Sequence, residues 1–126
     1  MTVETNQVGD VIVMKLSGEL TGRGELAPLF WAYLHRGNYK FILNCERLRA
    51  INSVGLSMLL EFKRLAEASG GAMVLHGLAV EVRQMLKTTR LDEVFTISDD
   101  EEVALSALIP GLPVINAGST VSRYRN

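Results

Sequence analysis

Three short apolar segments, separated by stretches with helical periodicity, limit the possible folds of this chain more than any other feature. The segments are Lys40–Asn44 (KFILN), Ala72–His76 (AMVLH) and Val94–Ser98 (VFTIS). Apolar runs of this length, bounded by turn residues, are typical of strands buried on both faces. Strands separated by helices of ten or more residues are joined by right-handed crossovers, so the pattern predicts a largely parallel sheet.

The N-terminus predicts an antiparallel addition to this sheet. Val3–Val8 and Val11–Ser17 have the character of two strands that meet at Gly9 and Asp10, which is a hairpin signal. The first strand therefore joins the sheet antiparallel to its neighbour.

Four helices are predicted between and after the strands. Apolar residues recur at helical spacing in the first and third of them, and the first helix has Pro28 within its first turn. The first three are expected over Glu25 to Gly37, Val54 to Ala68 and Leu78 to Thr89. The fourth begins at a capping box formed by Ser98 and Glu101 and ends at about Leu108. The predicted fold class is α/β, in the order β-β-α-β-α-β-α-β-α, mostly parallel with an antiparallel N-terminal strand.

The chain length suits one domain. The 126 residues are enough for a core without covalent staples. We expect a domain over residues 1–108 and a flexible C-terminal tail over residues 109–126, because the tail is rich in Pro, Gly and small polar residues. An extra strand or docking segment around Val114 and Ile115 is the alternative.

Charge and cysteine content narrow the class of protein. Thirteen Lys and Arg against fourteen Asp and Glu, with no basic block, argue against nucleic-acid binding. Glu4 and Asp10 stand where a signal peptide needs a basic start, and no stretch reaches the ~20 apolar residues that span a bilayer. The single Cys45 cannot form an intramolecular disulfide. We therefore expect a soluble, cytoplasmic protein without membrane insertion.

The usual catalytic and metal-binding patterns are missing from the sequence. His35 and His76 have no His or Cys at ligand spacing, so we expect no metal site. The glycines of residues 18–24 complete neither dinucleotide nor phosphate-loop motif, and no GxSxG surrounds Ser53 or Ser57. We expect no enzyme activity and no cofactor.

Two other residues leave alternatives open. Cys45 ends a predicted buried strand, where a small buried hydrophobe competes with a reactive thiol. Trp31 lies beside the apolar face of the first helix, where packing at the edge of the core competes with an exposed contact residue.

Ser53 stands out because of its position in the predicted fold. It follows a buried strand and its connection and precedes an apolar helix, so it lies at the carboxyl edge of the sheet, where ligands and partners bind open α/β folds. Asn52 and Ser53 are also favoured N-cap residues. From the residues alone, a helix cap and a functional serine both remain open.

Three segments carry a family resemblance. They are VMKLSGEL (Val13–Leu20), FILNCERLRAINSVGLSMLLEF (Phe41–Phe62) and GGAMVLHGLAVEVRQMLKTTRLDEVFTISDDEEVAL (Gly70–Leu105). Together they resemble the STAS domain family, and within it the single-domain anti-sigma factor antagonists of bacteria. The similarity spans about Val3–Leu108 and implies a STAS-like mixed sheet.

The resemblance implies a role for the serine. In that family the helix entrance commonly reads Asp-Ser-Ser/Thr-Gly-Leu, and the serine after the aspartate is phosphorylated by an anti-sigma factor that is also a serine/threonine kinase. The matching residues here are Asn52, Ser53, Val54, Gly55 and Leu56. Ser53 matches the phosphorylated residue, whereas Asn52 replaces a carboxylate that could orient the hydroxyl or assist a metal at the kinase site.

The implied function is a binding switch that regulates sigma-factor-dependent transcription. Unphosphorylated protein would bind the anti-sigma factor kinase and free a sigma factor, phosphorylation of Ser53 would release it, and a phosphatase is a second candidate partner. The expected partner surface comprises residues of two neighbouring connections: Asn52, Ser53, Val54, Gly55, and the turn Gly18, Glu19, Leu20.

Two other classes of function remain as alternatives. STAS domains also serve as constitutive scaffolds in stress-sensing complexes and as accessory subunits of lipid-transport ATPases, and Asn52 leaves this role open. Binding of a small ligand or nucleotide is a third class, which no sequence motif supports.

Overall fold

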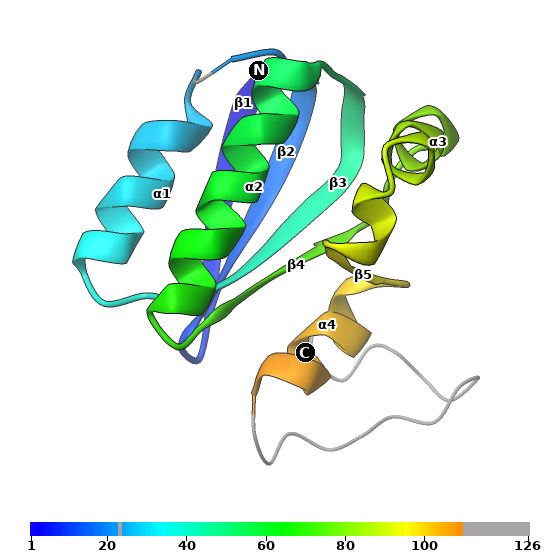
Figure 1. Ribbon diagram of the computed structural model, residues 1–126. Helices are drawn as coiled ribbons and strands as arrows, with labels where there is room; N and C mark the ends of the chain where they lie inside the picture. The colour runs from blue at the N-terminus through cyan, green and yellow to red at the C-terminus, as the bar shows by residue number, and fades with distance from the viewer. Residues whose placement is uncertain (23, 110–126) are drawn as a thin grey trace.

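A five-stranded sheet with strand order β1-β2-β3-β4-β5 organises the computed structural model, which describes residues 1–22 and 24–109 (Figure 1). The strands are β1 (Thr2–Val8), β2 (Val11–Leu20), β3 (Lys40–Ile51), β4 (Ala72–His76) and β5 (Thr96–Ser98). β1 pairs with β2 antiparallel, and every other neighbouring pair is parallel. The predicted fold class is confirmed.

Four α-helices and one 3-10 helix connect or follow the strands in the predicted order. They are α1 (Leu26–His35), α2 (Ser53–Ala68), α3 (Val80–Thr88), the 3-10 helix η1 (Leu91–Glu93) and α4 (Glu101–Leu108). None of the helices within the described ranges is long and apolar enough to cross a membrane.

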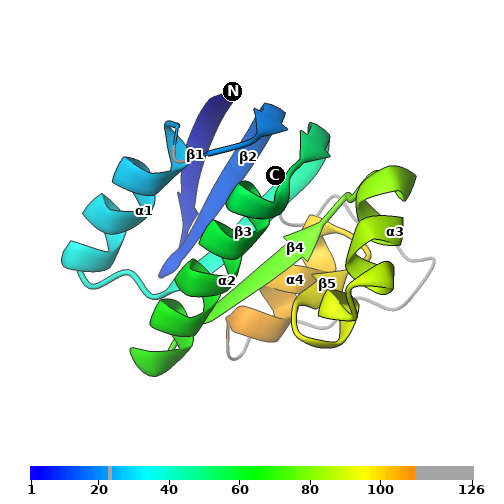
Figure 2. The same ribbon diagram turned by 45° about the horizontal axis from the view of Figure 1, so that its top comes forward.

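The sheet separates two apolar clusters, because side chains alternate along each strand. On β2, Ile12 and Met14 contribute to the larger cluster, which α1, α2 and α3 cover. Val11 and Val13 contribute to the smaller cluster under Ala104 and Leu105 of α4. Accordingly, α1 and α2 lie on one face of the sheet and α4 on the other (Figure 2).

Aromatic side chains fix α1 against α2 and the sheet. The rings of Phe30 and Phe62 stack at 4.1 Å between centroids, and Phe41 of β3 lies 4.8 Å from Phe30. Trp31 is half-buried and meets Phe62 edge to face at 6.3 Å. Of the two readings of Trp31, packing at the edge of the core is the one that the structure shows.

The two central strands are longer than the sequence predicts. β2 was expected to end at Ser17 and β3 at Asn44, but they continue in parallel pairing to Leu20 and Ile51. The predicted turn at residues 18–20 is therefore strand. β3 continues beyond the end of its pairing with β4, and the side chains of this second half are partly polar and exposed. The second half of β3 therefore lacks the apolar pattern of a buried strand, which is why the sequence placed the end of β3 too early.

The C-terminal elements also begin later than expected. β5 starts at Thr96, not Val94, because the chain first makes η1. The predicted capping box at Ser98 is wrong: Ser98 stays in β5, and Asp100 caps α4 by accepting a hydrogen bond from the Val103 amide at 2.9 Å. Strand pairing of Ser98 with His76 keeps Ser98 in β5, so the N-cap position falls to Asp100.

The predicted flexible tail covers residues 109–126, of which residues 110–126 lie outside the described part of the chain. The alternative strand or docking segment around Val114 and Ile115 lies outside it as well.

Candidate functional site

The candidate site lies where α2 begins, beside the carboxyl ends of two parallel strands. β2 ends at Leu20 and β3 at Ile51, and these two residues are register partners. α2 starts two residues later, at Ser53 (Figure 2). Ser53 therefore occupies the sheet edge that the sequence predicts for it.

Asn52 is the N-cap of α2 and joins the helix to the end of β2. Its Oδ1 accepts a hydrogen bond from the Gly55 amide at 2.9 Å, and its Nδ2 donates to the Thr21 carbonyl at 3.2 Å. Its backbone amide donates to the Leu20 carbonyl at 3.2 Å. An aspartate could make the cap, but its carboxylate has no hydrogen to donate to Thr21.

Gly55 and Leu20 support the site from beneath. A Cβ at Gly55 would lie 2.2 Å from the Leu20 carbonyl oxygen, so the close approach of α2 to β2 requires glycine. Leu20 is fully buried and Gly55 is buried as well. Their side-chain positions give a partner no exposed area, although both were included in the expected partner surface.

The exposed part of the site combines a hydroxyl with apolar surface. Ser53, Asn52 and Glu19 are exposed, Val54 is 56% exposed, and Gly18 is half-buried with a φ of +106°. These predicted residues lie on two adjacent segments, the end of β2 and the start of α2.

A shallow groove on α2 adds residues that sequence reasoning missed. Its lining is Ser53, Val54, Ser57, Met58 and Glu61. Ser57 and Glu61 follow Ser53 at intervals of four, and Met58 follows Val54 in the same way, so helical spacing could have identified them.

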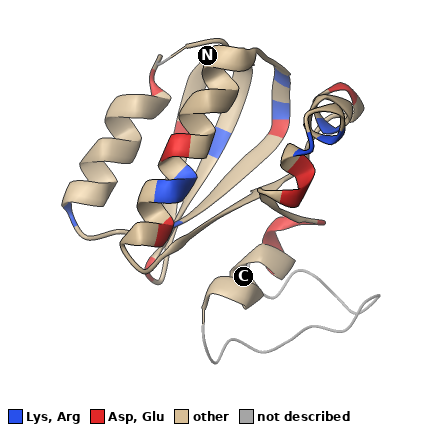
Figure 3. Cartoon of the chain, in the orientation of Figure 1, with Lys and Arg blue, Asp and Glu red and all other residues tan. Residues whose placement is uncertain are grey.

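The electrostatics at Ser53 favour an added anion. Ser53 is the first residue of α2, and its hydroxyl makes no hydrogen bond to any other residue within 1–22 and 24–109. The first turn holds no acidic residue, and the start of α2 is tan in Figure 3, the colour of uncharged residues. The positive end of the helix dipole and its free amides stabilise negative charge there.

The remaining candidates have structural explanations or lie elsewhere. Burial raises the pKa of the Cys45 thiol from 9.0 to about 12, which fits a buried hydrophobe and not a reactive thiol. His35 is exposed and its Nδ1 lies 2.9 Å from the Trp31 carbonyl. His76 is buried in β4, away from Ser53. Across the described ranges, no three His, Cys, Asp or Glu side chains converge as a metal site would require.

Comparison with known proteins relates the chain to one family. The family model described as "Mlab, STAS domain" matches residues 3–99. A candidate anti-sigma factor antagonist from Thermotoga maritima is 25% identical, with a TM-score of 0.73 over 84% of this chain and 93% of that one.

Two further solved structures share the fold at lower identity. An anti-sigma factor antagonist from Mycobacterium paratuberculosis is 24% identical, with a TM-score of 0.68 over 85% of this chain and 92% of that one. The Bacillus cell fate determinant SpoIIAA in its phosphorylated form is 23% identical, with a TM-score of 0.64 over 81% of this chain and 96% of that one.

Proposed function

The chain belongs to the STAS domain family, and from this membership we propose that it is an anti-sigma factor antagonist whose binding is switched by phosphorylation of Ser53. The unmodified protein binds a cognate anti-sigma factor that is also a serine/threonine kinase, and a sigma factor is thereby freed. The protein acts in the cytoplasm by binding and catalyses nothing itself, and a phosphatase resets it.

The observation that carries the proposal is the state of the Ser53 hydroxyl. It is exposed, it lies at the first position of α2, and it makes no hydrogen bond within the described part of the chain. A kinase can therefore reach it without unfolding the helix entrance. The structural cap is supplied by Asn52, so the serine is free for another task.

Phosphorylation would change the surface and leave the fold intact. A phosphoserine carries a charge of about −1.5 to −2 near neutral pH, and the N-terminus of α2 stabilises such an anion. In a close-packed interface over Val54, which is 56% exposed, the same dianion is poorly placed because its hydration shell would have to be removed. Release of the partner follows from that desolvation.

Asn52 affects the rate at which Ser53 is phosphorylated and does not prevent the phosphorylation. Asn52 lacks the carboxylate that relatives commonly place before the serine, so phosphorylation proceeds without that group's help in orienting the hydroxyl or assisting a metal. Its own side chain is held by Gly55 and Thr21, which keeps the helix entrance ordered.

The site assignment is tested by phosphorylation with the cognate kinase and ATP, followed by mass spectrometry. We expect one phosphate on the wild type and on Ser57→Ala, which changes the next serine along the same groove, and none on Ser53→Ala. Modification that persists in Ser53→Ala would refute the assignment.

A second candidate function is constitutive binding as an accessory subunit or scaffold. The helix entrance has Asn52 in place of the acidic residue, which favours this role as the alternative. In that case Ser53→Asp and Ser53→Ala would bind the partner with the affinity of the wild type, and no kinase would modify the chain.

A further inference from the structure

A row of polar side chains crosses the sheet on the face opposite α1 and α2. Successive register partners place one residue from each strand in this row: Glu4, Lys15, Asn44, His76 and Ser98. The neighbouring row on the same face contains Val13, Ile42 and Val74, which α4 covers. The sheet face therefore changes from apolar to polar at the point where α4 begins.

His76 has an unsatisfied polar atom in this row. The residue is 3% exposed, and its Nε2 is buried without a hydrogen-bond partner among the described residues. The Glu101 Oε1 atom lies 4.0 Å away, beyond hydrogen-bond distance. Buried polar side chains in native proteins are paired in the large majority of cases, so an unpaired Nε2 beside a cavity indicates a missing partner.

The cavity beside His76 is large enough for a small molecule. It has a volume of about 560 Å³ and is bounded by side chains of β1 to β4 and by the start of α4, including Asn44, Glu46 and Glu101. Small-molecule sites commonly have volumes of about 300–1,000 Å³. A smaller hollow of about 160 Å³ adjoins it and shares Glu4, Lys15, Asn44 and Glu46. We call the two together the sheet-face hollow.

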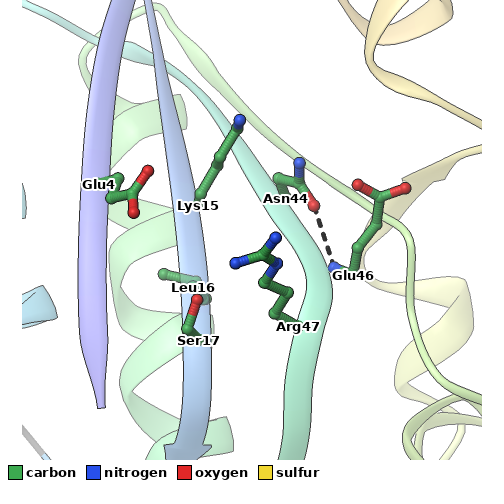
Figure 4. Close-up of a pocket in the computed structure, with 7 residues that line it drawn as sticks. All are labelled: Glu4, Lys15, Leu16, Ser17, Asn44, Glu46 and Arg47. Carbon is green, nitrogen blue, oxygen red and sulfur yellow. Dashed lines mark hydrogen bonds between the residues drawn. The ribbon is translucent and has the colours of Figure 1, made fainter.

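The sheet-face hollow presents charges of opposite sign at its two ends. Figure 4 shows Lys15 and Arg47 projecting over β2 and β3, and neither has a carboxylate within ion-pair distance among residues 1–22 and 24–109. Glu46 points away from Arg47, toward the side of β4 (Figure 4), and Glu101 lies beside His76. Glu4 of β1 also lines the hollow beside Lys15, but among the described residues it forms no ion pair with Lys15 or Arg47, and Asp100 precedes Glu101 at the other end. One end thus holds two unpaired cations bordered by Glu4, and the other is acidic, with a buried imidazole nitrogen that has no partner among the described residues.

We propose that the sheet-face hollow binds an elongated small zwitterion. Its anionic group lies between Lys15 and Arg47, and its ammonium group lies among Glu46, Glu101 and Nε2 of His76, which accepts a hydrogen from it. The anionic group lies between β2 and β3 and the ammonium group lies between β3 and β4 or over β4, so the charged groups of the ligand are between one and two strand spacings apart, roughly 5–10 Å. A short α-amino acid does not span this distance, whereas an ω-amino acid does.

The direct test is titration of the full chain with 6-aminohexanoate, followed by NMR. We expect saturable shifts of the His76 ring nitrogens and of the Lys15, Asn44 and Arg47 amides. Hexanoate and hexylamine, which each carry one of the two charges, should bind at least about tenfold more weakly. Absence of saturable shifts, or equal affinity for all three compounds, would overturn the proposal.

Variants separate the sheet-face hollow from other surfaces. His76→Phe and Lys15→Met should each weaken binding of 6-aminohexanoate by about tenfold or more. Lys87→Met changes an exposed lysine of α3, and Ser53→Ala changes the entrance of α2, so both should bind as the wild type does. Should His76→Phe fail to fold, Lys15→Met decides, because unchanged affinity in that variant also contradicts the proposal.

Discussion

Asn52 and Ser53 are adjacent, yet the structure gives them separate tasks. The side chain of Asn52 is engaged on both sides, by the Gly55 amide and the Thr21 carbonyl, whereas the hydroxyl of Ser53 is exposed. Both are good N-cap residues, so their order alone could not reveal which one caps. Asn52 is identified as the cap because its side chain accepts a hydrogen bond from the amide of Gly55, three residues further along the chain.

Gly55→Ala should strongly destabilise the protein. The added Cβ would lie 2.2 Å from the Leu20 carbonyl oxygen, which is backbone and cannot rotate away, so α2 must shift from β2. We expect a loss of at least about 2 kcal/mol in the free energy of unfolding, measured by urea denaturation. Gly22→Ala is the matched control because no atom of the other described residues lies within 4 Å of the added Cβ, and it should change stability by less than about 0.5 kcal/mol. Equal stability of the two variants would contradict the close approach.

Cys45 should make stability fall at alkaline pH. Burial raises the pKa of its thiol from 9.0 to about 12, so the unfolded chain loses this proton before the folded one does. The contribution of the neutral thiol is fully present below pH 9 and is lost as pH rises toward 12, at about 1.4 kcal/mol per pH unit.

Urea denaturation of the wild type and Cys45→Ala across this alkaline range isolates the thiol, because the two proteins differ only at this side chain. The stability difference should shrink or reverse as pH rises. A difference that is independent of pH would show that the folded thiol ionises normally.

The stability of the N-terminus of α2 depends on the Asn52 cap. Asn52→Ala removes the acceptor for the Gly55 amide and the donor to Thr21, and should lower the free energy of unfolding by about 1–2 kcal/mol. Asn52→Asp keeps the acceptor and should lose less. Thermal or urea denaturation of both variants measures this order, and the reverse order would contradict the assigned hydrogen bonds.

The helices and buried strands were predictable because their apolar periodicity comes from contact with the core. The apolar pattern is present in residues 40–44, which form the first part of β3, and in the whole of β4, and the sequence located both segments correctly. The second half of β3 could not be located in the same way. Among the described strands it pairs with β2 alone, and it has exposed charges at Glu46, Arg47 and Arg49, so its strand conformation depends on a distant partner and not on its own apolar pattern.

Across the whole molecule, the two faces of the sheet have different occupants. The face under α1 and α2 is a closed apolar core, whereas α4 covers only part of the other face. The sequence predicted that Ser53 lies at the sheet edge, since that follows from element order. It could not predict the sheet-face hollow, because the polar row joins residues from β1 to β5 through register, which the order of elements does not determine.

An acidic residue at the entrance of α2 should leave the fold intact. Ser53→Asp places a negative charge at the N-terminus of a helix whose first turn has no acidic residue. We expect the free energy of unfolding to stay equal or rise by about 0.3–1 kcal/mol, measured by urea denaturation at low salt. A marked loss of stability would mean that Ser53 has a structural role.

The central claim is that negative charge at Ser53 controls partner binding, and the most direct measurement is the dissociation constant for the cognate anti-sigma factor kinase. Isothermal titration should compare the wild type, Ser53→Asp and Ser69→Asp, in which the control charge lies at the exposed C-cap of the same helix. We predict binding at least about tenfold weaker for Ser53→Asp and unchanged for Ser69→Asp. Equal affinity of Ser53→Asp and the wild type would contradict the switch.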